Sequence, residues 1–317
     1  MARTDRSGSP APRTGSTVAS VVVPAHDEEA VVGALLHALA DGDADVVVVA
    51  NGCSDRTAAV AREVPGVRVV ETPVASKMRA LALGDRHASG FPRFYVDADV
   101  VLSAADLRLL VDALREPGVH AVGPERRLDL IGASVLVRAY YSVWARLPGV
   151  RRELYGRGVI CVDETGHRRL AGWPETMADD LVAAMSFTPK ELRVVAGAEV
   201  LIRGPRTYRD LLRRRVRAMT GNRRLARDAA APPLRPAGGG LTTLVSLTRH
   251  EPRLLPAVAV FLGTALLART RARWAVARGS TVWLRDESSR LPDRQPGPPR
   301  TTAAASTASA DQRERSS

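Results

Sequence analysis

The stretch from residue 18 to residue 50 decides the fold, and it reads VASVVVPAHDEEAVVGALLHALADGDADVVVVA. It begins with a run of mostly β-branched residues, Val18–Val23. Apolar residues then recur at helical spacing between Val31 and Leu39, and a second apolar run follows at Asp45–Ala50. Short apolar runs are typical of buried strands and the intervening spacing is typical of a helix, so the stretch predicts a strand–helix–strand unit.

The same alternation continues to residue 114. We expect further helices at Thr57–Glu63, Met78–Ala88 and Ala104–Leu114, and strands at Val67–Glu71 and Arg93–Val96. The strands are continuous apolar runs rather than alternating ones, so both faces of the sheet should be covered. This order predicts an α/β fold with a mostly parallel, Rossmann-like sheet flanked by helices. Ligands of such sheets bind at the carboxyl ends of the strands.

The composition restricts the class of protein. The chain has 317 residues, 45% of them hydrophobic, which excludes a wholly disordered chain and allows one large domain or two small ones. The net charge is +12, but aromatic residues make up only 4%, which argues against RNA binding by base stacking. Only Lys77 and Lys190 among the 46 basic residues are lysines, so the arginine count reflects a compositional bias. Cys53 and Cys161 are too few for a disulfide framework and indicate a reducing compartment.

The two ends of the chain lack apolar runs. Residues 1–17 lack the apolar stretch of a secretory signal, and residues 291–317 are Pro, Ser, Thr, Ala and charged residues. We expect both to be disordered tails. Between them we expect an α/β domain at residues 18–228 and a helical segment at residues 229–290.

Polar motifs follow the first two strands: PAHDEE at residues 24–29 and NGCSDRT at residues 51–57. Neither is a glycine-rich dinucleotide turn, and the sequence has no GxxxxGK[ST], so the two common phosphate-binding loops are absent. By itself the second motif also fits a plain turn at Asn51-Gly52, with Ser54 or Asp55 capping the next helix.

Two carboxylates follow the fourth strand, in the motif Asp97-Ala98-Asp99. Carboxylates next to a buried apolar strand need compensation by a cation or by tight hydrogen bonds. In an extended segment, residues two apart face the same way, so we expect Asp97 and Asp99 to address one hard divalent cation. Such an ion bridges phosphate oxygens and neutralises a departing diphosphate. The other interpretation is a turn in which an aspartate caps a helix.

Four motifs in this order resemble the family 2 glycosyltransferases: VPAHDEE, NGCSDRT, SKMRALALG before the fourth strand, and DAD after it. The resemblance spans about Val18–Leu225. It implies a GT-A fold, a nucleotide-diphosphate sugar as donor, and a divalent metal, Mg²⁺ or Mn²⁺, held by Asp99 with Asp97. The implied activity is that of a hexosyltransferase-like enzyme.

The resemblance assigns the donor nucleotide to the strand-end loops. The residues implied in holding the nucleoside are Pro24, Ala25, His26, Glu28, Asn51 and Asp55. Asn51 stands where the family often has Asp, which leaves the nucleobase open between uridine and guanosine. Lys77, with Asp97, is implied at the diphosphate, and a solvated lysine at a helix start is the alternative. Arg217 corresponds to a diphosphate-binding arginine, although the Trp that follows it in the family is missing here.

The resemblance also places acceptor and catalytic residues. Gly156, Arg157 and Gly158 match a glycine-rich segment on the acceptor side, and the alternative is an ordinary loop-to-strand turn. The paired acids Asp179 and Asp180 match the position of the base. An inverting transfer needs one carboxylate to take the proton of the acceptor hydroxyl, and Asp180 is our choice, with Asp179 as the runner-up. Both aspartates also suit the first turn of a helix.

Basic and apolar segments in the last third point to a membrane surface. Ten arginines and one acid lie between Arg203 and Arg227, and the fifteen uncharged residues Leu254–Ala268 are flanked by arginines. A helix of that length reaches about 22 Å, short of the ~30 Å of bilayer hydrocarbon. We expect peripheral or single-segment attachment to the cytoplasmic face of the inner membrane. Leu128–Val143, with Tyr140, Tyr141 and Trp144, is a second expected contact surface.

The sequence thus predicts a metal-dependent, inverting glycosyltransferase that acts on a lipid-linked or polysaccharide acceptor, without a nucleic-acid partner. One alternative is a nucleotidyltransferase on a related fold, although such enzymes usually have a Gly-rich basic loop after the first strand. Another is a non-catalytic, membrane-associated nucleotide-binding module whose acidic motif is structural.

Overall fold

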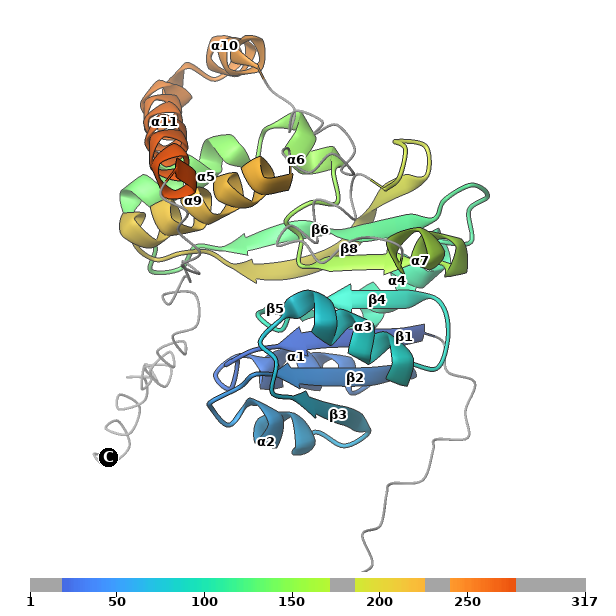
Figure 1. Ribbon diagram of the computed structural model, residues 1–317. Coiled ribbons are helices and arrows are strands. Elements are labelled where there is room, and N and C mark those ends of the chain that lie inside the picture. Colours follow the sequence, from blue (N-terminus) through green and yellow to red (C-terminus); the bar gives the residue numbers. More distant parts are fainter. Residues whose placement is uncertain (1–18, 172–185, 226–239, 278–317) are drawn as a thin grey trace, which may run out of the picture.

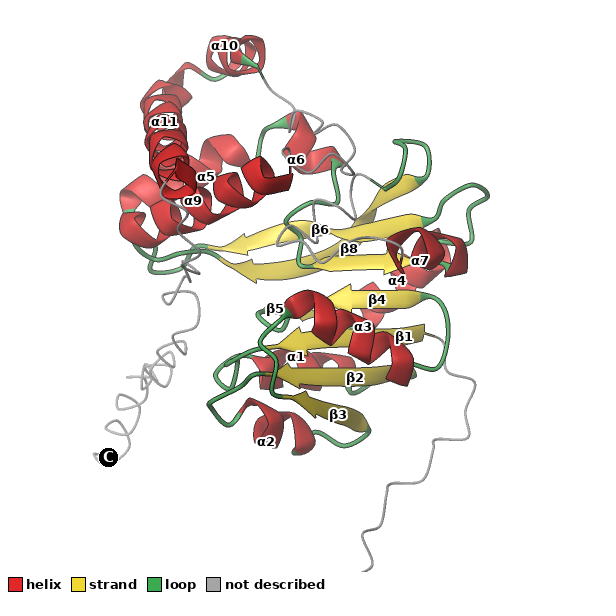
Figure 2. Cartoon of the chain, viewed as in Figure 1, coloured by secondary structure: helices red, strands yellow, loops and turns green. Residues whose placement is uncertain are grey.

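The computed structural model describes residues 19–171, 186–225 and 240–277. The described strands form one eight-stranded sheet in the order β3-β2-β1-β4-β7-β6-β8-β5, with helices on its faces (Figures 1 and 2). The α/β fold expected from the sequence is confirmed. Both expected tails lie outside the described residues. So do the two ends of the expected 229–290 segment, residues 229–239 and 278–290.

The first four strands agree closely with the sequence prediction. They are β1 (Ala19–Ala25), β2 (Ala44–Asn51), β3 (Val67–Thr72) and β4 (Arg93–Val96), all mutually parallel. The helices between and after them are α1 (Val32–Leu39), α2 (Thr57–Arg62), α3 (Lys77–His87) and α4 (Ala104–Ala113). Every residue of β1 is buried, as a strand covered on both faces requires.

The remaining strands make the sheet mixed. They are β5 (Val100–Leu102), β6 (Ala121–Asp129), β7 (Val159–Val162) and β8 (Leu192–Arg203). β7 runs antiparallel to both β4 and β6, β8 runs parallel to β6, and β5 runs antiparallel to β8. The regular βα alternation ends after α4, and with it the local signal for parallel neighbours ends too.

Helices from the second half form a layer over β6 and β8 (Figure 1). They are α5 (Val135–Trp144), α9 (Tyr208–Leu225) and α11 (Leu255–Ala277), with α10 (Leu241–His250) at one end of α11. Ala268 and Ala272 of α11 are buried in one cluster with Leu212 and Val216 of α9. These small side chains let the two helices pack closely. The shorter helices α6 (Pro148–Arg152), α7 (Glu164–Ala171) and η1 (Pro252–Leu254) complete the described elements.

The structure divides the second surface expected at Leu128–Val143 between a strand, a loop with the exposed Ile131, and a helix, and its contact with a membrane stays a prediction. Leu128 lies in β6, and the helix α5 begins only at Val135, so the stretch is not one amphipathic helix. Tyr140 and Tyr141 belong to a buried cluster, and the Tyr140 ring stacks on Phe261 of α11 with 5.1 Å between ring centroids. The aromatic rings are therefore used to join α5 to α11 rather than to face solvent.

Candidate donor site at the carboxyl edge of the sheet

Four loops converge at one edge of the sheet. β1, β2 and β4 are parallel, so the loops that follow them lie at the same edge. β7 is antiparallel to β4, with Val159 opposite Val96, so the loop that precedes β7 reaches this edge as well. The strand pairing therefore brings together the PAHDEE, NGCSDRT and DAD motifs and the glycine-rich segment 156–158.

The first two loops are tied together by reciprocal hydrogen bonds. Four of them cross between the loops: Ser54 N to Asp27 Oδ1 (2.7 Å), Glu29 N to Asp55 Oδ2 (3.1 Å), Arg56 N to Glu29 Oε2 (2.9 Å) and Glu28 N to Thr57 Oγ1 (2.7 Å). Partial burial favours a higher pKa for Asp55, but bonds from Thr57 and Glu29 outweigh it and hold that pKa below its ordinary value. Asp55 thus helps to fix both loops as an anion.

Asn51 and His26 join the end of β1 to the end of β2. The Asn51 side chain is only 3% exposed and donates to the Ala25 carbonyl over 2.7 Å. His26 Nδ1 lies 2.6 Å from the Asn51 carbonyl, and since that oxygen only accepts, the ring nitrogen is the donor. In this arrangement the Asn51 amide holds the strand ends, and contact with a nucleobase stays a prediction. Pro24 and Ala25 lie within β1 itself.

Lys77 and Asp97 meet at the centre of the edge. Lys77 is the first residue of α3, whose start is capped by Ser76, and its Nζ lies 2.6 Å from Asp97 Oδ1. Both side chains are partly exposed. The structure thus joins the cation and the carboxylate that the sequence places at the diphosphate. An anionic ligand that reached Lys77 would compete directly with Asp97, unless a metal ion occupied the carboxylate.

The DAD motif is a turn rather than the extended segment assumed from the sequence. Asp97 accepts at its carbonyl from Val100 N over 3.5 Å, and Ala98 and Asp99 form the turn between β4 and β5. The extended conformation expected from the sequence is therefore wrong, and the binding of one cation by both carboxylates stays a prediction. Asp99 is half-buried, and in the described parts of the chain no hydrogen bond or ion pair reaches its carboxylate. Two carboxylates on one short turn remain a suitable oxygen donor set for Mg²⁺ or Mn²⁺.

Gly158 packs directly against this turn. Its carbonyl accepts from Asp97 N over 2.7 Å, and its φ of +65° lies in the left-handed region. A Cβ at this position would lie 2.7 Å from Val100 Cγ1 and 3.2 Å from Asp97 Oδ2. Conformation and space both require glycine here. Gly156, at φ +68°, is the second left-handed glycine of the segment.

The side chain of Arg157 points into the protein rather than toward an acceptor. It is 1% exposed and donates to the main-chain carbonyls of Pro124 (2.6 Å), Arg151 (2.9 Å) and Glu153 (2.9 Å). Burial lowers the pKa of its guanidinium to about 10, so it stays charged at neutral pH. Arg157 therefore shapes the loop that carries Gly158, and its expected contact with the acceptor stays a prediction.

Sequence reasoning missed a second arginine that braces this segment. Arg126 of β6 donates to the carbonyls of Tyr155 (3.1 Å) and Gly156 (3.4 Å), and its guanidinium lies 4.8 Å from the Trp144 ring. These contacts are remote in sequence, so no local pattern announces them.

The structure does not place the three other predicted residues at this edge. Arg217 is half-buried on α9, the helix that packs against α5 and α11. Asp179 and Asp180 lie outside the described residues. Their roles at the diphosphate and as the base stay predictions.

Comparison with known proteins agrees with this geometry. The glycosyl transferase family 2 model matches residues 20–168, which include the first three loops and Gly158. The chain therefore contains a family 2 glycosyltransferase domain and is an enzyme of the glycosyltransferase class. A search of curated proteins finds no match.

Two solved structures resemble this chain to different degrees. The mannosyltransferase PcManGT from Pyrobaculum calidifontis, in complex with GDP-Man and Mn²⁺, is 23% identical over 83% of this chain and 81% of that chain, with a TM-score of 0.55. Glucosyl-3-phosphoglycerate synthase from Mycobacterium tuberculosis, in complex with phosphoglyceric acid, is 20% identical over 68% of this chain and 80% of that chain, with a TM-score of 0.48. The first likeness shows a shared GT-A fold, and the second is too distant to show more.

Proposed function

We propose that the protein transfers a sugar from a nucleotide-diphosphate sugar to a lipid-linked or polysaccharide acceptor, with a divalent metal and with inversion at the sugar carbon. One observation carries the proposal: the Asp97–Asp99 turn, paired with Lys77 and packed on Gly158, lies where the β1, β2 and β4 loops converge. This is the edge at which parallel sheets bind nucleotides.

The donor half of the reaction needs a held nucleotide and a stabilised leaving group. The interlocked β1 and β2 loops present a fixed floor for the nucleoside, since main-chain N–H groups of each loop donate to side-chain oxygens of the other. Asp99, with Asp97, would hold Mg²⁺ or Mn²⁺, which when bound neutralises the departing diphosphate. Lys77 then exchanges its contact with Asp97 for a phosphate oxygen. The fold relative solved with GDP-Man and Mn²⁺ supports this donor class.

The acceptor half needs a general base. We assign this role to Asp180, with Asp179 as the alternative, on the resemblance of the paired acids to those of the family. The carboxylate takes the proton of the acceptor hydroxyl as the oxygen attacks the sugar carbon from the face opposite the diphosphate. A single displacement of this kind inverts the configuration. Gly156 and Gly158 allow the left-handed backbone of the segment that we place on the acceptor side, and Gly158 lets this segment pack on the Asp97–Asp99 turn.

Attachment to a membrane surface by α11 completes the proposal. Among the described residues, one helix, Pro252–Ala275, is long and apolar enough to cross a membrane, and only 22% of its most apolar window is buried. It packs along α9, which carries Arg213, Arg214 and Arg217. Carrying these arginines to the bilayer centre with α11 would cost ~3 kcal/mol each. This packing favours a helix that lies in the membrane surface, at the cytoplasmic face of the inner membrane, where donor and lipid-linked acceptor meet.

Donor turnover tests the reaction. We expect metal-dependent release of a nucleoside diphosphate from at least one nucleotide sugar, in a panel of uridine and guanosine donors assayed with membrane lipid. Release of pyrophosphate from a nucleoside triphosphate supplied together with a sugar 1-phosphate, with no turnover of any nucleotide sugar, would instead identify a nucleotidyltransferase. Nucleotide binding without release would identify a non-catalytic nucleotide-binding module. No release, together with no metal-dependent nucleotide binding, would overturn the proposal.

Two matched variants separate the assigned roles. Asp99→Asn should abolish metal-dependent donor binding, whereas Asp180→Asn should keep donor binding and lower transfer by at least ~100-fold, since a lost general base typically costs ~10²–10⁴ in rate. Asp179→Asn is the control for the neighbouring acid. If Asp180→Asn turns over normally and Asp179→Asn does not, the base is Asp179.

A further inference from the structure

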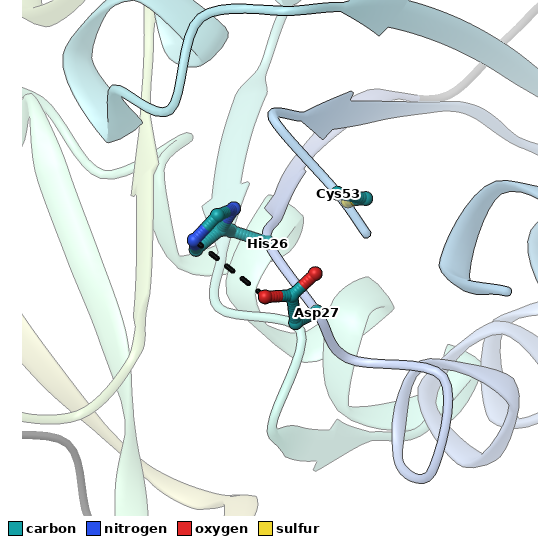
Figure 3. Close-up of side chains that lie close together, drawn as sticks. All are labelled: His26, Asp27 and Cys53. Atoms are coloured by element: carbon teal, nitrogen blue, oxygen red, sulfur yellow. Dashed lines mark ion pairs between the residues drawn. The ribbon is translucent and has the colours of Figure 1, made fainter. Parts of the chain in front are cut away.

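Three side chains of different chemistry meet beside the donor edge. His26 and Asp27 lie in the loop after β1, and Cys53 lies in the loop after β2 (Figure 3). One nitrogen, oxygen or sulfur atom from each lies within 4.8 Å of the other two. The donor edge described above uses the His26 ring and one Asp27 oxygen to join the two loops, and it gives no role to the combination of imidazole, carboxylate and thiol.

The loop bonds already orient the imidazole. His26 donates its Nδ1 hydrogen to the Asn51 carbonyl over 2.6 Å, so the Nε2 atom carries the lone pair. That Nε2 atom lies 3.8 Å from Asp27 Oδ2. Histidines that bind metal ions almost always donate their other ring hydrogen to a carbonyl or carboxylate, which fixes the tautomer and the ring. His26 therefore has the outer hydrogen bond of a metal ligand.

Asp27 is held in place by backbone conformation and by the second loop. Its φ of +52° lies in the left-handed region, which Asp tolerates better than most residues. Its Oδ1 accepts from both the main-chain nitrogen (2.7 Å) and the hydroxyl (3.2 Å) of Ser54. These bonds fix the carboxylate while leaving Oδ2 on the side of His26. The residue next to Ser54 is Cys53, so the same loop positions the sulfur.

We propose that His26, Asp27 and Cys53 form a site for a thiophilic divalent cation of the Zn²⁺ type, separate from the Asp97–Asp99 turn. His26 Nε2, one Asp27 oxygen and the Cys53 sulfur are the ligands, and the thiol proton passes to solvent as the metal–sulfur bond forms. No change of oxidation state is involved. Nitrogen and sulfur donors select Zn²⁺ or Co²⁺ over Mg²⁺, and three protein ligands leave a tetrahedral ion one position for water.

Co²⁺ is the probe, because a cobalt–thiolate bond gives a charge-transfer absorption that oxygen and nitrogen ligands do not give. The full chain, with any affinity tag removed, is titrated with Co²⁺ in the absence of nucleotide. We expect a saturable band at one equivalent of metal, removed by added Zn²⁺ and kept in excess Mg²⁺. No band at saturating Co²⁺, or loss of the band in excess Mg²⁺, would overturn the proposal.

The two cysteines provide a matched pair of variants. Cys53→Ala should abolish the band, whereas Cys161→Ala should keep it, because Cys161 is fully buried in β7. His26→Ala and Asp27→Asn should each weaken Co²⁺ binding at least ~10-fold, since even outer partners of metal ligands are worth ~10–100-fold. Asp99→Asn should bind Co²⁺ with the same band. Circular dichroism of each metal-free variant checks its folding, and a band that survives Cys53→Ala in a folded protein would refute the site.

Discussion

Two regions of the molecule differ in how far they bury their apolar side chains. One is the half built on β1–β4, and the other is the helical layer of α5, α9, α10 and α11. All residues of β1 are buried, and the core formed with β2 and β4 is continuous. In α11, by contrast, Leu266 is 66% exposed and Trp274 is 65% exposed. The first half buries most of its apolar residues in a continuous core, whereas α11 buries one face against its neighbours and leaves apolar residues exposed on the other. The well-buried half provides a rigid edge for a soluble ligand. The exposed apolar residues of α11 are suited to contact with an apolar partner such as a membrane.

Arginines lie in two kinds of environment. Arg157 and Arg93 are buried, and Arg157 spends its donors on main-chain carbonyls, while Arg93 pairs with Asp85 at 2.7 Å. On α11, Arg269, Arg271 and Arg273 are exposed beside apolar side chains. The same residue type therefore serves as an internal brace at some positions and as a surface charge at others. The arginine-rich composition does not stand for one function.

The largest expected effect concerns the rigid edge. Gly158→Ala combines a strained φ with a contact of 2.7 Å to Val100, and should lower the free energy of unfolding by about 2–4 kcal/mol. Gly118→Ala is the control, because Gly118 also has a positive φ, +80°, but has no atom within 4 Å of an added Cβ. Its cost should be about 1 kcal/mol. Urea denaturation measures both, and equal losses would show that the packing on the Asp97–Asp99 turn is dispensable.

The next effect tests the helical layer. The double variant Leu262→Gln/Leu266→Gln changes exposed residues of α11 and should weaken binding to anionic vesicles about tenfold, with stability unchanged. Leu109→Gln on α4 is the matched control, because Leu109 and Leu262 are both 44% exposed. Vesicle co-sedimentation measures binding. If Leu109→Gln weakens it as much, or if the double variant binds normally, α11 is not the attachment surface.

The smallest effect concerns the half built on β1–β4. Partial burial favours a higher pKa for Asp45, but hydrogen bonds from Arg68 and Ser89 outweigh it and hold the pKa below its ordinary value. Asp45→Asn should therefore lower the free energy of unfolding by about 1 kcal/mol at pH 7. Because the pKa is lower in the folded state, Asp45 stabilises the fold fully at pH values above its unfolded-state pKa of ~3.9. This stabilisation is lost as the pH falls through the folded-state pKa, so the variant and the parent should have converging free energies of unfolding at acid pH.

Asp43→Asn is the control for this last effect, because Asp43 is exposed two residues away. Its free energy of unfolding should stay within ~0.5 kcal/mol of the parent at every pH. A difference between Asp45→Asn and the parent that persists unchanged below the unfolded pKa would show that charge is not the cause. Thermal unfolding followed from neutral to acid pH measures both variants.

Much of the first half could be predicted residue by residue. β4 has the predicted bounds, Arg93–Val96, and α3 begins at Lys77, one residue before the predicted Met78. The reason is local: continuous apolar runs between helical periodicities specify buried parallel strands without reference to distant residues. The carboxyl-end rule then placed Asn51 and Asp97 at one edge. The same rule could also have predicted that His26 lies near Cys53, since the two residues follow adjacent parallel strands.

The sequence by itself determined the alternation of strands and helices, the family motifs and the edge where they meet, because these follow from local periodicity and strand direction. Only the tertiary structure decided that β7 returns antiparallel and brings Gly158 onto Asp97, that Arg157 turns inward, and that α11 buries one stripe and exposes another. These features depend on pairings between residues far apart in the chain. Such contacts stabilise the fold only after distant segments have come together, so no local pattern of residues predicts them.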